Sequence, residues 1–250
     1  MKILIPTFNR TTQHTLNSLP YEIQQNTFLV SPIPLPYDQV IIQPEHIRGI
    51  ANKRQWMMEW AAEKGWDTVV MLDDDLRFSR RRTDNPKLFE QATHRDIAGA
   101  FYDMKAMPSL GYVHFGMSAR GGANFVTDDY VQNTRMTRVL GYDVKTFMMQ
   151  GIRFNRVPLM EDFDVTLQLL RKGYPNILIN DLVHDQGSSN APGGCSTYRT
   201  MEMQAEAAEK LASLHPEFVT VVKKQTKTSW GGQERTDVRV RWKAAFGADL

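Results

Sequence analysis

An apolar run that leads directly into three aspartates constrains this chain more than any other feature. Residues 68–72 read as a buried β-strand, and Asp73, Asp74 and Asp75 follow without a spacer. Adjacent carboxylates repel one another, and burying even one is costly unless it is paired. A divalent cation would remove that cost. The chain must therefore place this triplet at the end of a core strand.

The segments around the triplet predict an α/β fold. Apolar and β-branched runs indicate strands at 2–6, 27–31, 39–42 and 68–72, and helical spacing indicates helices at 11–19 and 49–64. This alternation is typical of an open, mixed and mostly parallel sheet with helices on both faces. Ligands bind such sheets at the carboxyl ends of the strands, which is where the triplet lies.

The second half of the chain is less regular. We expect strands at 96–102, 112–115, 124–127 and 177–179, and helices at 163–172 and 201–213.

Composition excludes several classes of protein. Hydrophobic residues make up 42% of the 250 residues, enough for a real core and too many for a disordered chain. Cys195 is the single cysteine, which excludes an internal disulfide framework and a cysteine-rich zinc site and fits a reducing compartment. No apolar run approaches the roughly 18 residues of a membrane span, and the first residues do not form a signal peptide. We expect a cytoplasmic protein, in the host cytoplasm if it is viral, with no membrane contact and no obligate protein partner.

Charge is unevenly distributed, although the net charge is only +2. Seven basic and two acidic residues give the segment 221–243 a formal charge of +5. We therefore expect a body at 1–220 and a basic extension at 221–250 that packs on or near the active-site face. Such an asymmetry indicates a polyanionic partner, or else a solvated surface strand or helix.

The triplet itself suggests a metal site. In a strand-like stretch Asp73 and Asp75 point to one side and Asp74 to the other, so the first and third can face one ligand. Mg²⁺ and Mn²⁺ take oxygen ligands and commonly use one or two carboxylates together with substrate phosphates. A helix cap or a solvated turn is the alternative.

Two further groups are candidates for chemistry. Glu161 and Asp162 begin a predicted helix, either as first-turn acids or as a general base that deprotonates an acceptor hydroxyl. His184 follows a predicted strand and is the best nitrogen ligand for the same cation, unless it is structural. The glycine-rich loop 187–194 after it is either a lid over a ligand or a surface loop.

Together these pieces resemble the nucleotide-sugar glycosyltransferases of the GT-A fold, in particular family 2. Four stretches match in order over roughly residues 1–185. They are Pro-Thr-Phe-Asn-Arg at 6–10, Gly-Ile-Ala-Asn-Lys-Arg at 49–54, Val-Met-Leu-Asp-Asp-Asp at 70–75, and Met-Glu-Asp-Phe-Asp at 160–164 with Leu-Arg-Lys-Gly-Tyr at 170–174.

The resemblance implies roles for individual residues. Asp75 would bind Mn²⁺ or Mg²⁺ bridging the donor diphosphate, with His184 as a further ligand, and Asp73 would contact the ribose or the metal through water. Asp162, in the same acidic cluster as Glu161, would be the base if the enzyme inverts. The remaining donor contacts would come from Thr7, Asn9 and Arg10 near the nucleotide and Arg54 near the base or phosphates.

The chain departs from the family-2 pattern at the second strand. Val30-Ser31-Pro32 stands where an acid usually reads the nucleobase, so the donor base stays open, with a UDP-sugar expected first. The Gln-x-x-Arg-Trp motif of processive membrane synthases is also missing from the acceptor helix.

A narrower resemblance is to the small bacteriophage glycosyltransferases associated with TET-like oxygenases, which transfer sugar to 5-hydroxymethylpyrimidines in DNA. It implies hexosyl or pentosyl transfer to a base such as 5-hydroxymethylcytosine, extruded from the duplex. Lys223, Lys224 and Lys227 would contact phosphates. Trp230 and Trp242 would stack on the displaced base or pack on the core.

Other functions stay open at this point. A nucleotidyltransferase of similar fold would share the sheet and the metal, but its glycine-rich opening is missing after the first strand. A glycosyltransferase acting on a glycan or small molecule, and a non-catalytic nucleic-acid-binding protein, are further alternatives. The donor sugar, the stereochemical course and the oligomeric state are not determined by these motifs.

Overall fold

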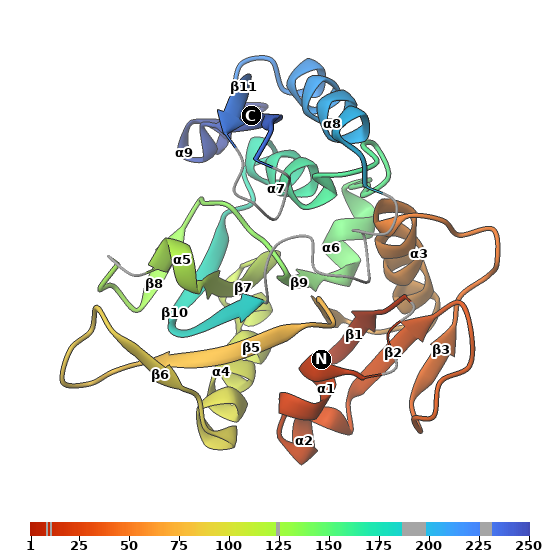
Figure 1. Ribbon diagram of the computed structural model, residues 1–250, viewed down its shortest axis with the longest axis vertical. Coiled ribbons are helices and arrows are strands. Elements are labelled where there is room, and N and C mark those ends of the chain that lie inside the picture. The colour runs from red at the N-terminus through yellow and green to blue at the C-terminus, as the bar shows by residue number, and fades with distance from the viewer. Residues whose placement is uncertain (9, 11, 124–125, 187–198, 226–231) are drawn as a thin grey trace.

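A mixed β-sheet forms the centre of the protein (Figure 1). The computed structural model describes the 250 residues except 9, 11, 124–125, 187–198 and 226–231. The sheet, ten-stranded within these described residues, consists of β1 (Lys2–Pro6), β2 (Thr27–Ser31), β3 (Val40–Ile42), β4 (Thr68–Leu72), β5 (Leu76–Arg81), β6 (Phe89–Gln91), β7 (His114–Ala119), β8 (Tyr130–Gln132), β9 (Val139–Asp143) and β10 (Asn176–Gln186).

The strand order is β3-β2-β1-β4-β9-β7-β10-β5-β6, with β8 beside β10. The first four neighbours are parallel, whereas β9 runs antiparallel to β4 and β5 antiparallel to β10. The carboxyl ends of β1 and β4 therefore lie at one edge of the sheet, where ligands bind in such folds. The predicted mixed α/β fold class is confirmed.

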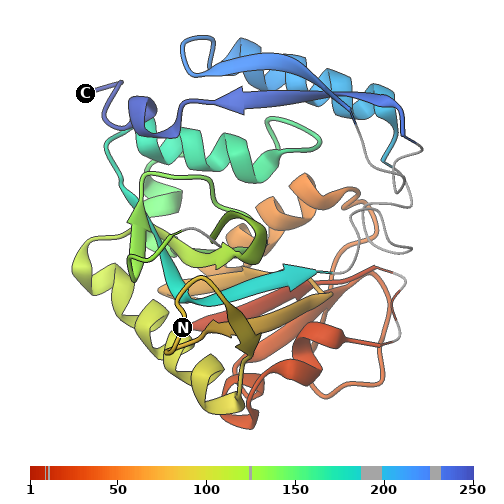
Figure 2. The same ribbon diagram turned by 60° about the vertical axis from the view of Figure 1, so that its left-hand side comes forward.

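Helices cover both faces of this sheet (Figures 1 and 2). They are α1 (His14–Ser18), α2 (Tyr21–Gln24), α3 (Ile50–Glu63), α4 (His94–Ala106), the 3-10 helix η1 (Met107–Leu110), α5 (Arg120–Ala123), α6 (Val144–Met149), α7 (Glu161–Arg171), α8 (Met201–Leu214) and α9 (Trp242–Ala245). Alternate residues of β1 point to opposite faces. Ile3 and Ile5 pack in the core that includes α4, and Leu4 packs in the core of α3, α6 and α7.

A third core lies outside the sheet. The antiparallel hairpin of β11 (Val219–Gln225) and β12 (Glu234–Val240) packs with α8 and α9 against the outer side of α7. Figure 2 shows α8 and this hairpin as a layer above α7, far from α4. Leu167 and Leu170 of α7 share this core with Leu211 of α8 and Val238 of β12. Helix α7 is therefore held between the sheet and the C-terminal layer.

Several sequence predictions are confirmed at or near their bounds. The strands at 2–6, 27–31 and 68–72 are β1, β2 and β4, and the helices expected at 49–64, 163–172 and 201–213 are α3, α7 and α8. The helix expected at 11–19 corresponds to the shorter α1, and the strands expected at 39–42, 112–115 and 177–179 correspond to β3, β7 and β10.

The strand expected at 96–102 is wrong, because these residues belong to α4. Thr93 and Asp96 form a reciprocal capping box that starts this helix. The apolar residues then recur at helical spacing on the buried face, at Ile97, Ala100, Phe101 and Met104. The period of these buried positions, and not their β-propensity, decides the conformation.

The strand expected at 124–127 is not found at Val126 and Thr127, which are the residues of this range that the structure describes. Residues 124–125 lie outside the described part, Val126 and Thr127 are in a loop, and β8 begins only at Tyr130.

No helix of the described residues is long and apolar enough to cross a membrane.

A buried histidine makes the fold sensitive to acid. The ring of His114 stacks on Tyr142 with 4.4 Å between centroids, and its Nδ1 lies 3.0 Å from the Gly141 carbonyl oxygen. Burial lowers the pKa of His114 to about 4, although the Gly141 contact opposes this. In the unfolded chain the histidine binds a proton near pH 6.5, so protonation favours the unfolded state between pH 6.5 and pH 4. The free energy of unfolding is therefore highest above pH 6.5 and decreases as the pH falls towards 4.

We expect this histidine to contribute about 2 kcal/mol to the loss of unfolding free energy between pH 7 and pH 5. Urea unfolding at both pH values should show a shallower pH dependence for His114→Asn than for the original chain. Equal slopes in the two proteins would contradict this prediction.

Candidate active site

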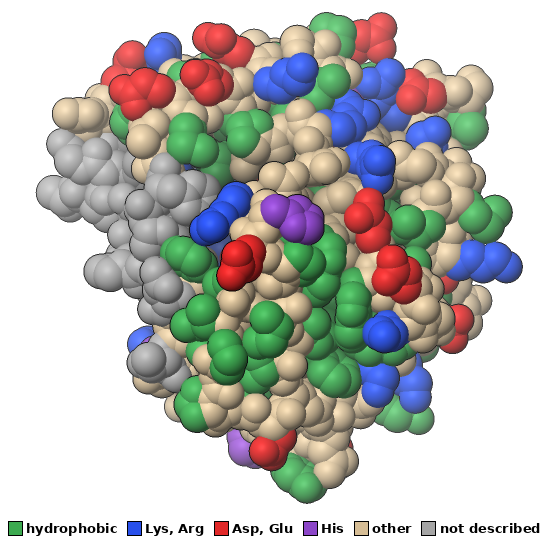
Figure 3. Space-filling view, turned by 90° about the vertical axis from the view of Figure 1, so that its right-hand side faces the viewer, with side chains coloured by type: hydrophobic (Ala, Val, Ile, Leu, Met, Phe, Trp, Pro, Cys, Tyr) green, Lys and Arg blue, Asp and Glu red, His purple; other side chains and the backbone are tan. Residues whose placement is uncertain are grey.

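A cleft of about 1510 Å³ opens at the carboxyl ends of β1 and β4. The loops after these two strands, the start of α3 and the start of α7 form one wall, and the β11–β12 hairpin and α9 form the other. On the β3 and α3 side, acidic and basic side chains are interspersed with apolar ones (Figure 3). That visible surface has no large field of a single sign, which agrees with the net charge of +2.

Asp74 joins the loop after β1 to the loop after β4. The Thr7 hydroxyl donates to Asp74 Oδ2 at 2.9 Å, and Arg10 Nε forms an ion pair with Asp74 Oδ1 at 3.2 Å. The Arg10 guanidinium also donates to Asp75 Oδ2 at 3.2 Å. Burial raises the pKa of Asp74 to about 6, against the opposing effect of Arg10 and Thr7. The middle aspartate thus holds the two loops together, while Asp73 and Asp75 stay half-buried on the cleft wall.

Arg54 connects α3 to both acidic clusters. Its Nη1 donates to Glu161 Oε1 at 2.6 Å and its Nη2 donates to Asp73 Oδ1 at 2.8 Å. Burial alone would lower the pKa of Arg54, but Glu161, Asp73 and Asp162 raise it above its ordinary value. The guanidinium is 4% exposed and stays charged between two carboxylates.

Three carboxylates act on the charge of Arg54 at this point of the cleft: Glu161, Asp73 and Asp162. Burial raises the pKa of Glu161 to about 7, although Arg54 opposes this shift. Burial also raises the pKa of Asp73, again against the effect of Arg54. Asp75 raises the pKa of Asp73 further. These carboxylates are therefore desolvated as well as close to one another.

Asp162 is placed by the first turn of α7. It is half-buried, lines the cleft, and its Oδ1 accepts a hydrogen bond of 3.0 Å from the Phe163 amide. The preceding residue, Met160, has a left-handed backbone with φ 60°. Arg138 is also left-handed, at φ 61°, and its carbonyl accepts from the Asp73 amide at 3.1 Å. Non-glycine residues in this conformation are strained, and such residues gather at functional sites.

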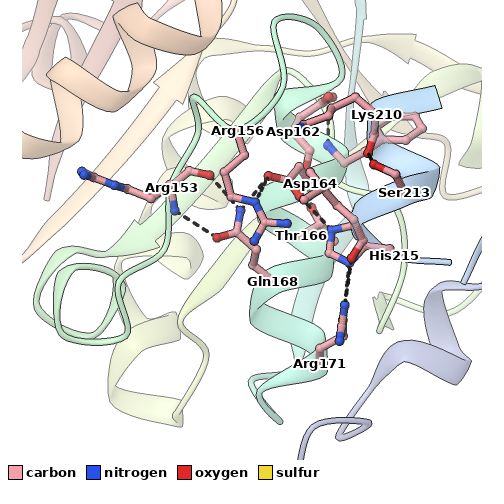
Figure 4. A network of polar contacts seen from close by, with 12 residues as sticks. Arg153, Arg156, Asp162, Asp164, Thr166, Gln168, Arg171, Lys210, Ser213 and His215 are labelled. Carbon is pink, nitrogen blue, oxygen red and sulfur yellow. Dashed lines mark hydrogen bonds and ion pairs between the residues drawn. The ribbon is translucent and has the colours of Figure 1, made fainter. Parts of the chain in front are cut away.

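A buried polar network fixes the far side of α7 (Figure 4). Asp164 accepts from Gln168 Nε2 at 2.8 Å, lies 2.7 Å from His215 Nε2 and forms an ion pair with Arg156 at 3.2 Å. Arg171 lies 3.1 Å from the other ring nitrogen of His215. The network joins α7 to the end of α8 and so fixes the helix that carries Glu161 and Asp162.

His184 lies away from the cleft surface. It is fully buried in β10, between β7 and β5, and does not line the cleft. Burial and, to a smaller extent, the charge of Arg138 lower its pKa to about 3. In the part of the chain that the structure describes, no three His, Cys, Asp or Glu side chains are grouped so that they could hold one metal ion.

The other predicted site residues divide into three groups. Thr7, Arg10, Arg54 and Lys224 line the same cleft as the two acidic clusters. Lys223 does not line it and donates to the Thr236 hydroxyl at 2.8 Å. Asn9, Lys227, Trp230 and the loop 187–194 lie outside the described residues.

Sequence reasoning did not identify Arg135 and Arg138, which also line the cleft. Strand β9 runs antiparallel to β4, with Val139 opposite Leu72, so the residue before β9 lies beside the residue after β4. The two arginines at 135 and 138 come just before an apolar strand, and this position was the one sequence signal that could have indicated a role in the cleft. Their place beside the aspartates depends on the pairing of β9 with β4, which local patterns do not specify.

Comparison with known proteins identifies the family. The model of the TET-associated glycosyltransferases matches residues 34–194. Two curated proteins named beta-glucosyl-HMC-alpha-glucosyl-transferase, from Enterobacteria phages T6 and T2, are 25% and 24% identical over 193 residues. These matches cover 72% of this chain, which spans only 65% of the length of each relative.

Solved structures of similar shape include residues 1–349 of TarS from S. aureus, with a TM-score of 0.48 and 11% identity, covering 85% of this chain and 66% of that one. A197 from STIV has a TM-score of 0.43 and 12% identity, covering 76% and 87%. The family model spans well over half of the chain and includes the acidic triplet and the start of α7. This protein therefore belongs to the TET-associated glycosyltransferase family.

Proposed function

We propose that the protein transfers a hexosyl or pentosyl group from a nucleotide sugar to the hydroxymethyl group of 5-hydroxymethylcytosine in DNA, with Mn²⁺ or Mg²⁺ as cofactor. One observation carries the proposal: Asp73, Asp75 and Asp162 line a single cleft at the carboxyl end of β4. Carboxylates for a cation and a carboxylate for a base thus face the same space.

The donor set of the cleft fits a hard divalent cation. Asp73 and Asp75 offer carboxylate oxygens, and both line the cleft. Mg²⁺ and Mn²⁺ usually keep several ligands from water and substrate phosphates, so two protein carboxylates suffice. His184 is fully buried in β10, and it stays the predicted nitrogen ligand for this cation. When bound, the cation would neutralise the departing diphosphate.

The nucleotide would lie along the wall formed by Thr7, Arg10 and Arg54. Arg10 and Arg54 are held on this wall by their ion pairs with the aspartates, and so add fixed positive charge near the phosphates. Asn9 is assigned to the same wall on the strength of the sequence motif alone. UDP-sugars are the first donors to test.

Asp162 is the proposed base in the inverting route. The acceptor hydroxyl oxygen forms a bond to the anomeric carbon, the bond from that carbon to the diphosphate oxygen breaks, and Asp162 accepts the hydroxyl proton. Glu161 is 5% exposed and bound to Arg54, so its contact supports a positioning role. We therefore assign the proton transfer to Asp162 and the alignment of Arg54 to Glu161.

The acceptor is proposed from the relatives. Their names specify transfer involving HMC, but this chain covers only 65% of their length, so their full activity is not carried over. The names of the relatives also include a beta-glucosyl-HMC group, so a glycosylated base is the second acceptor to test.

The direct test incubates the protein with Mn²⁺, a panel of nucleotide sugars and duplex DNA that carries cytosine, hydroxymethylcytosine or glucosylated hydroxymethylcytosine. We expect nucleoside diphosphate release together with a mass gain of one sugar on hydroxymethylated DNA. Transfer to glycans or small molecules with none to DNA would refute the proposed acceptor. Pyrophosphate release from nucleoside triphosphate and sugar phosphate would favour a nucleotidyltransferase.

Substitution of the proposed base tests the chemistry separately. Asp162→Asn should lower kcat about 10²- to 10⁴-fold, because the variant cannot accept the hydroxyl proton. The KM values for the nucleotide sugar and for DNA should change little, because the amide keeps the shape of the side chain. A kcat within a few fold of the original would show that another group accepts the proton.

A further inference from the structure

One part of the cleft wall is aromatic and cationic. The Arg135 guanidinium lies 4.5 Å from the centroid of the Phe163 ring. The centroids of the Phe163 and Trp242 rings are 5.3 Å apart. The interplanar angle between the two rings is 74°. All three side chains line the cleft, although they come from the loop before β9, from α7 and from α9.

Trp242 is more exposed to solvent than Phe163, the ring on which it packs. It packs at the margin of the third core and is half-buried, whereas Phe163 is 8% exposed. Trp242 also lines a second cavity of about 380 Å³, whose other residues are Asn133, Thr134, Arg241, Lys243 and Ala244. The indole therefore borders two spaces, and one of them is the cleft that contains Asp162.

The position of this wall relative to Asp162 is fixed by the chain itself. Phe163 follows Asp162 in the first turn of α7, and Trp242 packs against Phe163. Helix α9 is held there by Ala245, which is fully buried in the third core with Leu167 and Leu170 of α7. A planar group resting on this wall would occupy the same cleft as the residue proposed to deprotonate the acceptor.

We propose that Trp242 is the stacking platform for the extruded pyrimidine, with Arg135 and Phe163 as the supporting side of the acceptor subsite. The inference rests on the proposed function and names the residues that hold its acceptor. A base inside a duplex must leave the stack before its substituent can react, and an aromatic side chain replaces the lost stacking. The flat face of the base meets the indole, and its hydroxymethyl group points towards Asp162.

The adjoining hairpin carries charges that suit the DNA backbone on either side of such a base. Lys224 and Arg235 are cross-strand neighbours, both line the cleft, and both form ion pairs with Asp237, at 3.2 and 2.6 Å. Two cations against one carboxylate leave this trio with a net positive charge beside the platform. Phosphates flanking the extruded nucleotide would meet this charge.

The test compares Trp242→Phe with Trp242→Leu, because both keep apolar packing on the third core and only the first keeps an aromatic face. Phe246→Leu is the matched control, since Phe246 lies in the same C-terminal segment, is 43% exposed and does not line the cleft. Steady-state kinetics use duplex DNA with hydroxymethylcytosine opposite guanine or opposite an abasic site, so that stacking is measured with and without the cost of breaking a base pair. Thermal unfolding checks that each variant is folded.

We expect Trp242→Leu to raise the KM for DNA by about 10- to 100-fold, and Trp242→Phe by only a few fold. The increase should persist on the abasic-site duplex, and the KM for the nucleotide sugar should not respond. Equal KM values for DNA in the original chain and in Trp242→Leu would overturn the platform while leaving the proposed function intact. Failure of the original chain to modify any of these duplexes would overturn both.

Discussion

Replacing Asp75 by asparagine is expected to reduce sugar transfer by about 10³-fold or more, with little change in stability. The side chain lies on the cleft wall at 21% exposure, and its contact is the Arg10 ion pair at 3.2 Å, so its loss leaves no buried charge unpaired. Without this carboxylate the site loses one of the two oxygen donors proposed for the cation, and the developing charge on the diphosphate is less stabilised. Initial rates at saturating donor and acceptor measure the effect.

Two controls separate a metal role from a general effect of charge. Asp103→Asn removes an exposed carboxylate from α4, which covers the face of the sheet where α1 and α2 also lie, and should leave the rate unchanged. Chelation of divalent ions should reduce the original enzyme to the level of Asp75→Asn, and added Mn²⁺ should restore only the original. A fully active Asp75→Asn variant would refute the proposed cation site.

Replacing Arg54 by methionine should have the largest effect on stability. Arg54 is 4% exposed and donates to both Glu161 and Asp73, so its removal leaves two carboxylates in the site without their main partner. Loss of one member of a buried ion pair typically costs about 3–5 kcal/mol. Urea unfolding at pH 8 should show a decrease of this size in the free energy of unfolding.

The deficit of Arg54→Met should shrink as the pH falls. The pKa of Glu161 is already about 7 in the folded protein, above the value near 4.3 of an unfolded chain, and it rises further without Arg54. A carboxyl group with a raised folded-state pKa destabilises the fold at high pH and stops doing so once it is protonated. The difference between the two proteins should therefore be smaller at pH 5.5 than at pH 8.

Adding Glu161→Gln to Arg54→Met provides the internal check. The double variant lacks one of the two unpaired charges, so it should regain part of the lost stability at pH 8 and show a weaker pH dependence. A deficit in Arg54→Met that is independent of pH and insensitive to Glu161→Gln would mean that lost packing, and not buried charge, causes the effect.

The parts of the site that follow strands with strong local patterns were predictable from the sequence. The run from Val69 to Leu72 is fully buried in β4, so the position of the triplet after it followed from residue order alone. The grouping of Arg54 with Glu161 could not be derived in the same way. These residues are 107 positions apart and meet only because α3 and α7 pack on the same face of the sheet.

The second half of the fold was harder to predict for a related reason. Strand β5 contains three arginines, Arg77, Arg80 and Arg81, yet it pairs with β10 through the register of His184 with Phe78. Strands β11 and β12 bury mainly Val219 and Val238 against helices, so each carries little apolar signal. In these elements tertiary pairing overrides the local preference.

The separate core beneath the hairpin affects how this enzyme could be re-engineered. Side chains that shape the acceptor wall are supported by α8, α9 and the outer side of α7, whereas the loops after β1 and β4 are supported by the two cores of the sheet. If the proposed acceptor wall is correct, we expect substitutions in the last fifty residues to change acceptor choice more than donor affinity. The Glu161–Arg54 bridge sets the boundary of that freedom, because any change that tilts α7 is transmitted through it to Asp73.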